Sequence, residues 1–161
     1  MTGGGVQAPR IQQRIKGEQL TNINFKGYVS PRELRDIQSR SHCAIITLKD
    51  SMLGCMSPRK LHAILAMGLP VFYLGPAGSS VDRAIVGDGC GESIRHGDID
   101  NFVDRLELLS RSSELQQQYS RSARRAFEDR YCDEPNLPLF DAVIDGTYTE
   151  KTTAGLGQKA A

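Results

Sequence analysis

The pattern of apolar and polar positions along this chain switches repeatedly between short apolar runs and longer segments with helical spacing. The runs HCAIITL and VFYL are continuous and bounded by polar or turn residues, which is typical of strands buried on both faces of a parallel sheet. The stretch NINFKGYV, and GCGESI after a glycine-rich turn, also predict short strands. We therefore expect strands within residues 22–29, 42–48, 71–74 and 89–94.

The segments between these runs carry the signals of helices. Ser30, Pro31 and Glu33 form a capping box, in which the serine accepts from the third helical N–H and the glutamate reaches back. Strands and helices alternate four times, which predicts an α/β fold with a parallel, Rossmann-like sheet of about four strands and helices on both faces. Later helices are expected to begin at Ser57, at Ser79 or Ser80, and at Asp98, with others within residues 6–20, 113–130 and 137–145.

The composition fits a globular domain and excludes several classes of protein. Hydrophobic residues make up 39% of the 161 residues, which suits a folded domain over residues 1–145 followed by a flexible tail over 146–161. The net charge of +1 gives no electrostatic case for binding nucleic acid. Without a bilayer-length apolar run or a C-x-x-C pair, the chain is expected to be cytoplasmic, with reduced cysteines. The histidines share no ligand spacing, so no metal site is predicted.

The stretch SPRKLHAILAMGLPV, which begins at Ser57, contains the candidate chemistry. A helix N-terminus presents unpaired N–H groups and a partial positive charge, which is a setting for a phosphate. Arg59 and Lys60 add cations in the first turn, where the helix dipole disfavours them, and Gly54 permits close approach of the backbone. An anionic ligand would turn that small cost into a gain. The alternative is a capped surface helix with two solvated cations.

Several stretches, taken in order, resemble a known family. They are NINFKGYVSPRELRDIQSRSHCAIITL, MSPRKLHAILAMGLPVFYLGPAGSSVDRAI, GCGESIRHGDIDNFVDRLELL and ARRAFEDRY. Together they resemble the carboxy-terminal, nucleotide-sugar-binding domain of GT-B glycosyltransferases, and most of all the retaining group called family 4, or glycosyl transferases group 1. The resemblance extends from about Gly3 to Tyr131.

The resemblance implies a function and a set of site residues. The chain would be the donor-binding domain of an enzyme that transfers a glycosyl group from a nucleotide diphosphate sugar to a saccharide or lipid-linked acceptor in polysaccharide biosynthesis. The nucleotide sugar would be a substrate, and no separate cofactor is implied. The residues implied at the diphosphate are Ser57, Arg59 and Lys60, with Gly54 beside them, and those near the ribose and nucleobase are Gly27, Tyr28, His62 and Ala63.

Two positions depart from the family pattern. Many members have glutamates in an E-x7-E pattern, and here the two positions are Cys55 and Ala63, neither of which carries a carboxylate. No catalytic residue is therefore assigned, and this chain alone is expected to be inactive. The alternative function is a non-catalytic remnant or a regulatory nucleotide-binding module. A sugar-nucleotide epimerase is a third possibility, but it would need a carboxylate pair that we cannot place.

The resemblance also implies that the domain is incomplete at its start. The stretch Met1–Gly5 resembles the end of the domain's second strand, so the first strand, the first helix, most of the second strand and an amino-terminal acceptor domain are expected to be missing. Their loss would expose sheet edges, through which copies of the chain could associate with one another. The missing acceptor domain and the donor sugar are the expected partners, together with peripheral association with the inner membrane, where bacterial enzymes of this type often work.

Overall fold

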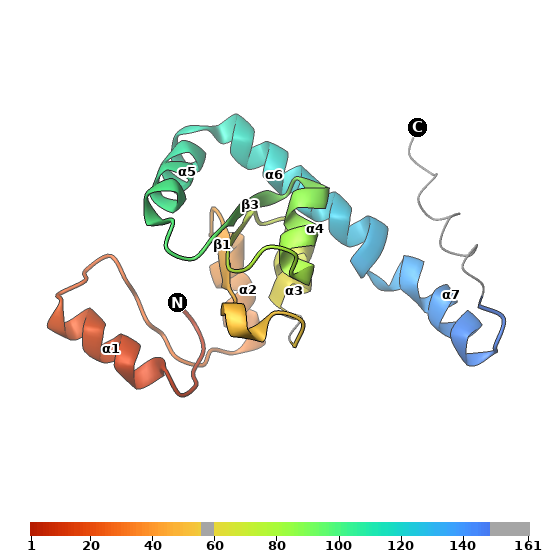
Figure 1. Cartoon of the computed structure of the whole chain (residues 1–161), viewed down its shortest axis with the longest axis horizontal. Helices are drawn as coiled ribbons and strands as arrows, with labels where there is room; N and C mark the ends of the chain where they lie inside the picture. Colours follow the sequence, from red (N-terminus) through yellow and green to blue (C-terminus); the bar gives the residue numbers. More distant parts are fainter. Residues whose placement is uncertain (56–59, 149–161) are drawn as a thin grey trace. The chain divides into compact units, whose positions relative to one another are not determined.

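A computed structural model describes residues 1–55 and 60–148 (Figure 1). Within them the chain divides into two compact units, one over Met1–Ser41 and one from His42 onward. The residues expected to form a flexible tail lie mostly outside the described ranges, as do the candidate residues Ser57 and Arg59.

The first unit contains two helices, and neither has a fully buried residue. They are α1 (Ala8–Gly17) and α2 (Pro31–Ser39). The Ser30 hydroxyl accepts from the Glu33 N–H at 3.2 Å, as the capping box predicts. The Glu33 carboxylate does not reach back to the start of the helix but accepts from Lys26 at 3.3 Å. The exposed ammonium of Lys26 competes for that carboxylate, so half of the predicted box forms.

The prediction of a strand within residues 22–29 is wrong. That segment is irregular, although it bonds to the start of the chain through Lys26 N–H to the Met1 carbonyl at 2.9 Å and Gly3 N–H to the Gly27 carbonyl at 2.6 Å. A strand needs a continuous ladder, and these bonds reach only a few residues before the chain turns at Gly27. The described residues therefore contain three strands where about four were predicted.

The second unit is built on a parallel sheet, which confirms the predicted α/β class with its Rossmann-like arrangement. Its strands follow the order β1-β2-β3, and both neighbouring pairs are parallel. Ala44 is level with Val71, and Val71 with Gly91, so equivalent positions on the strands share a face of the sheet. The bounds are β1 (Ala44–Thr47), β2 (Val71–Leu74) and β3 (Gly91–Ile94).

Helices follow each strand at the positions expected from the sequence (Figure 1). Ser79 caps α4, as predicted, while Asp98 precedes α5 without a side-chain capping bond. The long helix predicted to reach residue 130 ends earlier and continues as a short π-helical segment, η2. The elements are η1 (Asp50–Met52), α3 (Lys60–Ala66), α4 (Ser80–Asp88), α5 (Ile99–Arg111), α6 (Ser113–Ala126), η2 (Phe127–Tyr131) and α7 (Asp133–Ile144).

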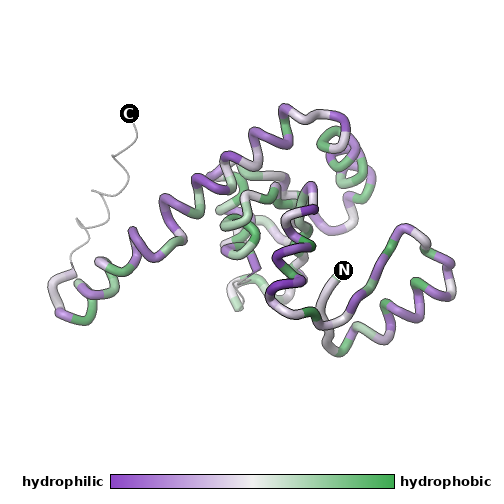
Figure 2. The backbone as a smooth tube through the Cα atoms, turned by 180° about the vertical axis from the view of Figure 1, so that it is seen from behind, coloured by the Kyte–Doolittle hydropathy of each residue, from purple (hydrophilic) through white to green (hydrophobic). Residues whose placement is uncertain are grey.

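The core lies on both faces of the sheet, and Figure 2 shows hydrophobic residues concentrated in this central region. One face is packed by α3, α4 and the end of α6, around Val71 and Tyr73 of β2. The other is packed by α5 and α6, where Phe72 meets Phe102 edge to face at 6.1 Å between ring centroids. Because β2 is central, these strand residues are fully buried.

The prediction that HCAIITL is buried on both faces is wrong, since β1 lies at an edge and its Ile45 is 53% exposed.

A polar network joins three elements on the second of these faces. The Glu92 carboxylate on β3 accepts from the Arg105 guanidinium on α5 and from the Tyr119 hydroxyl on α6. The Glu92 side chain is 18% exposed, so charge-assisted bonds formed there are stronger than surface pairs. This network fixes α5 and α6 against the sheet.

The last described helix, α7, contacts η2 and leaves most of its large apolar side chains exposed. The exposed fractions of Leu137, Phe140 and Ile144 are 57%, 69% and 75%. Separately, no helix in the described ranges combines the length and apolar character needed to cross a membrane.

Candidate functional site

The carboxyl ends of the three strands meet at one edge of the sheet, because all three run in the same direction. Ligands of open parallel sheets bind outside this edge. The chain leaves it through residues 48–55 after β1, residues 75–79 after β2 and residues 95–98 after β3.

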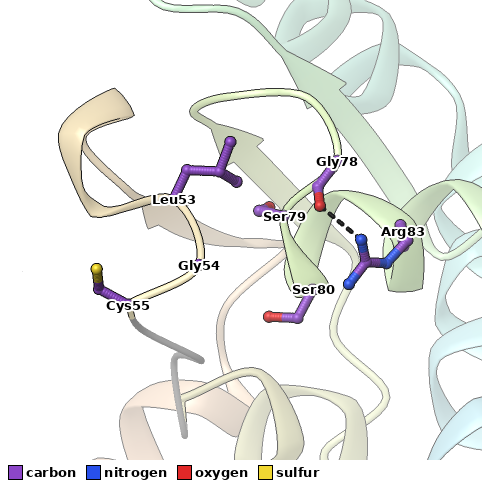
Figure 3. A pocket seen from close by; sticks show the side chains of 7 residues that line it. All are labelled: Leu53, Gly54, Cys55, Gly78, Ser79, Ser80 and Arg83. Carbon is purple, nitrogen blue, oxygen red and sulfur yellow. Dashed lines mark hydrogen bonds between the residues drawn. The ribbon is translucent and has the colours of Figure 1, made fainter.

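A cavity of about 340 Å³ lies between the first two of these loops. Figure 3 shows the loop after β1 on one side and the start of α4 on the other. Gly54, with φ +80°, turns the first loop in a conformation that side-chain-bearing residues rarely adopt. The lining residues are Leu53, Gly54 and Cys55 from the first loop, and Gly78, Ser79, Ser80 and Arg83 from the second side.

The amino-terminal end of α4 supplies most of the polar character of this cavity. Ser79 is the N-cap, and its hydroxyl accepts from the Asp82 N–H at 3.0 Å. The guanidinium of Arg83 lies beside the same turn and donates to the Gly78 carbonyl at 2.7 Å, as Figure 3 shows. The positive end of the helix dipole and an arginine therefore lie together at the cavity wall, which favours a negatively charged ligand.

Asp82 holds the turn between β2 and α4 in place. Its carboxylate accepts from the Gly78 N–H at 2.7 Å, from the Ser93 hydroxyl and from Arg95 at 2.9 Å. Arg95 in turn donates to the Gly75 carbonyl at 3.0 Å. The turn is therefore bonded at both ends to side chains of α4 and of the segment after β3, so the cavity wall on this side is built on a fixed frame.

The surroundings of Asp82 keep its carboxyl ionised. Burial acts to raise its pKa. The hydrogen bonds from Ser93, Arg95 and Gly78, with the positive charge of Arg95, outweigh the burial and hold the pKa of Asp82 below its ordinary value. The carboxylate and the guanidinium thus remain a charged pair in the folded chain at neutral pH.

His96 connects the loops that follow β3 and β1. Its Nε2 lies 2.6 Å from the Leu48 carbonyl, so this nitrogen carries the proton and donates. The Asp50 carboxylate of η1 lies 3.8 Å from the same nitrogen. The first loop is therefore anchored at its start, six residues before Gly54.

The structure places some of the residues that the sequence nominated for the diphosphate. Gly54 lines the cavity. Lys60 is the first residue of α3 and is exposed, but it does not line the cavity. Ser57 and Arg59 lie outside the described residues, so the predicted cap of α3 is not tested.

The residues nominated for the ribose and nucleobase belong to different units of the chain. The His62 ring stacks on Tyr131 of η2, with centroids 4.9 Å apart and planes 23° from parallel. Ala63 is exposed on α3. Gly27 and Tyr28 belong to the first unit, where the Tyr28 ring packs against Gly4 and is 86% exposed.

Sequence reasoning identified the capping serine of α4 but missed the role of this helix at the cavity. Ser79 and Arg83 repeat the features that drew attention to the segment from Ser57 to Lys60, namely a capping serine and a cation one turn later. Both helices follow strands of the same parallel sheet, so both begin at its carboxyl edge. The predicted position of α4 after a strand of the parallel sheet was therefore the signal that could have placed this helix at the site. Within residues 1–55 and 60–148, no group of His, Cys, Asp and Glu side chains could hold a metal ion.

A solved structure of another protein shares the fold over most of the chain. It is described as "Crystal Structure of WaaG, a glycosyltransferase involved in lipopolysaccharide biosynthesis", and it superposes with a TM-score of 0.64 at 18% sequence identity. The chain has a glycosyltransferase-like fold. The match covers 89% of this chain and 36% of the WaaG chain, so the similarity extends over about a third of that enzyme. No protein-family model and no curated protein sequence matches the chain.

Proposed function

We propose that this chain is a donor-binding part of a retaining glycosyltransferase, and that the cavity beside α4 receives the diphosphate of a nucleotide diphosphate sugar. The single observation that carries the proposal is the meeting of Arg83, the capped amino-terminal end of α4 and Gly54 around one cavity at the carboxyl edge of the sheet. The sequence resemblance to family 4 glycosyltransferases and the fold shared with WaaG support it.

The chemistry of the cavity fits a diphosphate better than a neutral ligand. The amino-terminal end of α4 carries the positive end of the helix dipole, and phosphate oxygens are strong hydrogen-bond acceptors. In the proposed complex, Arg83 exchanges its bond to the Gly78 carbonyl for a charge-assisted bond to the ligand. Lys60 at the start of α3, the helix that precedes α4 in the chain, adds a positive charge.

The proposal assigns binding to this chain and places glycosyl transfer in a larger assembly. In that assembly the helix dipole and the cations stabilise the departing diphosphate, which is an electrostatic contribution to catalysis. Acceptor recognition, which this chain is not proposed to perform, belongs to an acceptor domain carried elsewhere. A cytoplasmic location at the inner membrane surface belongs to the same proposal.

Calorimetric titration of uridine and guanosine diphosphates into the chain tests the proposal. We expect saturable binding of at least one of them, weakened about tenfold in Arg83→Ala because one charge-assisted hydrogen bond is lost. Lys60→Ala should weaken binding less, since that side chain is exposed and does not line the cavity.

The control variant is Arg121→Ala, which removes an equal charge from an exposed position on α6. It should leave binding unchanged. The proposal fails if neither nucleotide binds, or if Arg121→Ala weakens binding as much as Arg83→Ala does, because the attraction would then be a property of the net charge.

The second candidate function is a regulatory or remnant module that binds a nucleotide without supporting transfer. Cys55 and Ala63 favour it, because neither can supply a carboxylate to the sugar or the ribose. Titration of inorganic pyrophosphate, uridine diphosphate and a uridine diphosphate sugar separates the two functions. A donor-binding part should prefer the complete donor, whereas a remnant that retains only anion affinity should bind pyrophosphate equally well.

A further inference from the structure

The hydrogen-bond ladder between β1 and β2 lacks a backbone donor at the carboxyl edge of the sheet. The Ala44 N–H donates to the Pro70 carbonyl at 2.8 Å, and the Leu48 N–H donates to the Leu74 carbonyl at 3.1 Å. In a parallel pair, a residue of this kind also accepts, through its own carbonyl, from the residue two positions after the one to which it donates. The ladder donor to the Leu48 carbonyl would therefore be residue 76, which is Pro76 and has no N–H.

His96 supplies the missing donor from the segment after β3. Its Nε2 lies 2.6 Å from the Leu48 carbonyl. The ladder between β2 and β3 ends in a similar way, because the Gly75 N–H donates to the Ile94 carbonyl at 3.1 Å while the Gly75 carbonyl accepts from the Arg95 guanidinium at 3.0 Å. Two consecutive side chains after β3 therefore close both ladders at the edge where the cavity lies.

The loop that begins at Leu48 forms one wall of the cavity through its residues 53–55. Met52 of this loop packs against the core, and apolar packing is not directional. The hydrogen bond from His96 to the Leu48 carbonyl is directional. The Asp50 carboxylate, 3.8 Å from the same nitrogen, adds an attraction when the ring is protonated. His96 therefore determines the direction in which the loop leaves the sheet.

We propose that His96 is a positioning residue for the cavity. Its Nε2–H takes the place of a backbone donor at the Leu48 carbonyl, and so keeps Gly54 and Cys55 across the cavity from the amino-terminal end of α4 (Figure 3). The inference rests on the proposed function of this cavity as the diphosphate site. His96 does not line the cavity, so it acts through the loop and is assigned no contact with the ligand.

Two conservative substitutions separate the hydrogen bond from the rest of the ring. A glutamine side chain carries an N–H donor about as far from the backbone as Nε2, whereas the asparagine amide reaches only about as far as Nδ1. His96→Gln should therefore keep the bond to the Leu48 carbonyl, and His96→Asn should lose it. His42→Leu is the control, because it replaces an exposed histidine that precedes β1 at the other end of the strand.

Hydrogen exchange of the chain without ligand measures the effect on the loop. The Leu53 and Cys55 amides each donate to a carbonyl within the loop at 3.1 Å. In His96→Asn both should exchange about tenfold faster, because the loop has lost its directional anchor. His96→Gln and the control should exchange like the unsubstituted chain. The Val71 amide, which is bonded in the centre of the sheet at 3.0 Å, should stay protected in every variant.

Titration of a nucleoside diphosphate relates the position of the loop to the proposed site. His96→Asn should bind the nucleotide about threefold more weakly than His96→Gln, since its loop occupies the binding position for a smaller fraction of the time. Equal affinities of the two variants would overturn the role of His96 at the site. The exchange experiment contains no nucleotide, so it decides whether His96 positions the loop even if the proposed function fails.

Three further results would overturn the proposal. The first is equal exchange of the Leu53 and Cys55 amides in His96→Asn and His96→Gln. The second is faster exchange of the Val71 amide together with these two, because His96 would then stabilise the whole sheet and not position the loop. The third is a nitrogen NMR spectrum of the unsubstituted chain at pH 8 in which Nδ1 of His96 carries the proton. This last measurement needs no variant, so the test stands even if a substituted chain fails to fold.

Discussion

Arg95 and Asp82 form a hydrogen-bonded ion pair at 2.9 Å, although they lie on different elements, the segment after β3 and the first turn of α4. The Asp82 side chain is 11% exposed, so its charge depends on this partner and on the Ser93 hydroxyl. The pair holds the turn that forms one wall of the proposed diphosphate site. Its stability and the geometry of that site are therefore linked through the same contacts.

Replacing Asp82 by asparagine should destabilise the second unit and change its response to acid. The loss of a charged acceptor for Arg95 and Gly78 is expected to lower the free energy of unfolding by about 1–3 kcal/mol. Because the folded-state pKa of Asp82 is lowered, its contribution is present above the unfolded pKa of about 3.9 and is lost as the pH falls through the folded value. Urea unfolding followed by circular dichroism measures both effects.

The pH comparison separates the charge from the shape of the side chain. The unsubstituted chain should lose stability on acidification below about pH 5 more steeply than Asp82→Asn does. Equal slopes in the two proteins would show that the Asp82 carboxyl does not gain from its partners in the folded state.

Tyr119→Phe tests the polar network on the other face of the sheet. The hydroxyl donates to Glu92, and the substitution leaves that carboxylate with Arg105. We expect a loss of about 1 kcal/mol, the usual net value of one hydrogen bond. Glu92→Leu should cost more, because it leaves the Arg105 guanidinium and the Tyr119 hydroxyl without their shared acceptor. Thermal unfolding ranks the two variants. If Tyr119→Phe lost more stability than Glu92→Leu, the shared Glu92 carboxylate would not be the main source of the network's stability.

The cysteines are expected to react at different rates with a thiol reagent. Burial raises the pKa of Cys90 to about 11, and burial also raises the pKa of Cys43, so both remain thiols at pH 8. Cys55 is exposed and lines the cavity. Peptide mapping after brief labelling should find Cys55 modified and Cys90 unmodified, with Cys90 reacting after urea is added.

A nucleoside diphosphate should slow the modification of Cys55 if it occupies the proposed site. Cys132, which lies just before α7, is the internal control, and its rate should not change. Protection of both cysteines would indicate a general effect of the nucleotide on the chain, and protection of neither would place the ligand away from the loop after β1.

Local patterns predicted most of the fold, and the differences come from neighbours that local patterns do not contain. The strands VFYL and GCGESI and the cap at Ser79 were correct, because a buried apolar run and a capping serine are features of a few adjacent residues. The exposure of Ile45 could not be predicted in this way. Burial of a strand on both faces depends on which strands lie beside it, and β1 has a single neighbour in the described sheet.

The same reasoning applies to the candidate site. Gly54 was nominated for its backbone freedom and does line the cavity. Arg83 was missed because it stands four residues after the capping Ser79, in a segment whose sequence pattern predicts a helix but does not indicate a binding site. The sheet topology brings that helix to the same edge as the loop of Gly54. Long-range placement of this kind is set by strand order, which apolar periodicity does not encode.

Gly91→Ala should be strongly destabilising, and the reason is space and not conformational entropy. Gly91 is the first residue of β3 and lies level with Val71 of β2. A Cβ atom at this position would overlap the backbone carbonyl of Val71, and neither backbone can move without disturbing the ladder. We expect a loss of about 2 kcal/mol or more, within the range for overpacking a core.

Gly87→Ala, in α4, is the matched control, because a Cβ there meets nothing within 4 Å. It should be neutral or stabilising in urea unfolding, since alanine favours helix over glycine by up to about 1 kcal/mol. Equal losses in the two variants would mean that β2 and β3 are not as close as the register requires.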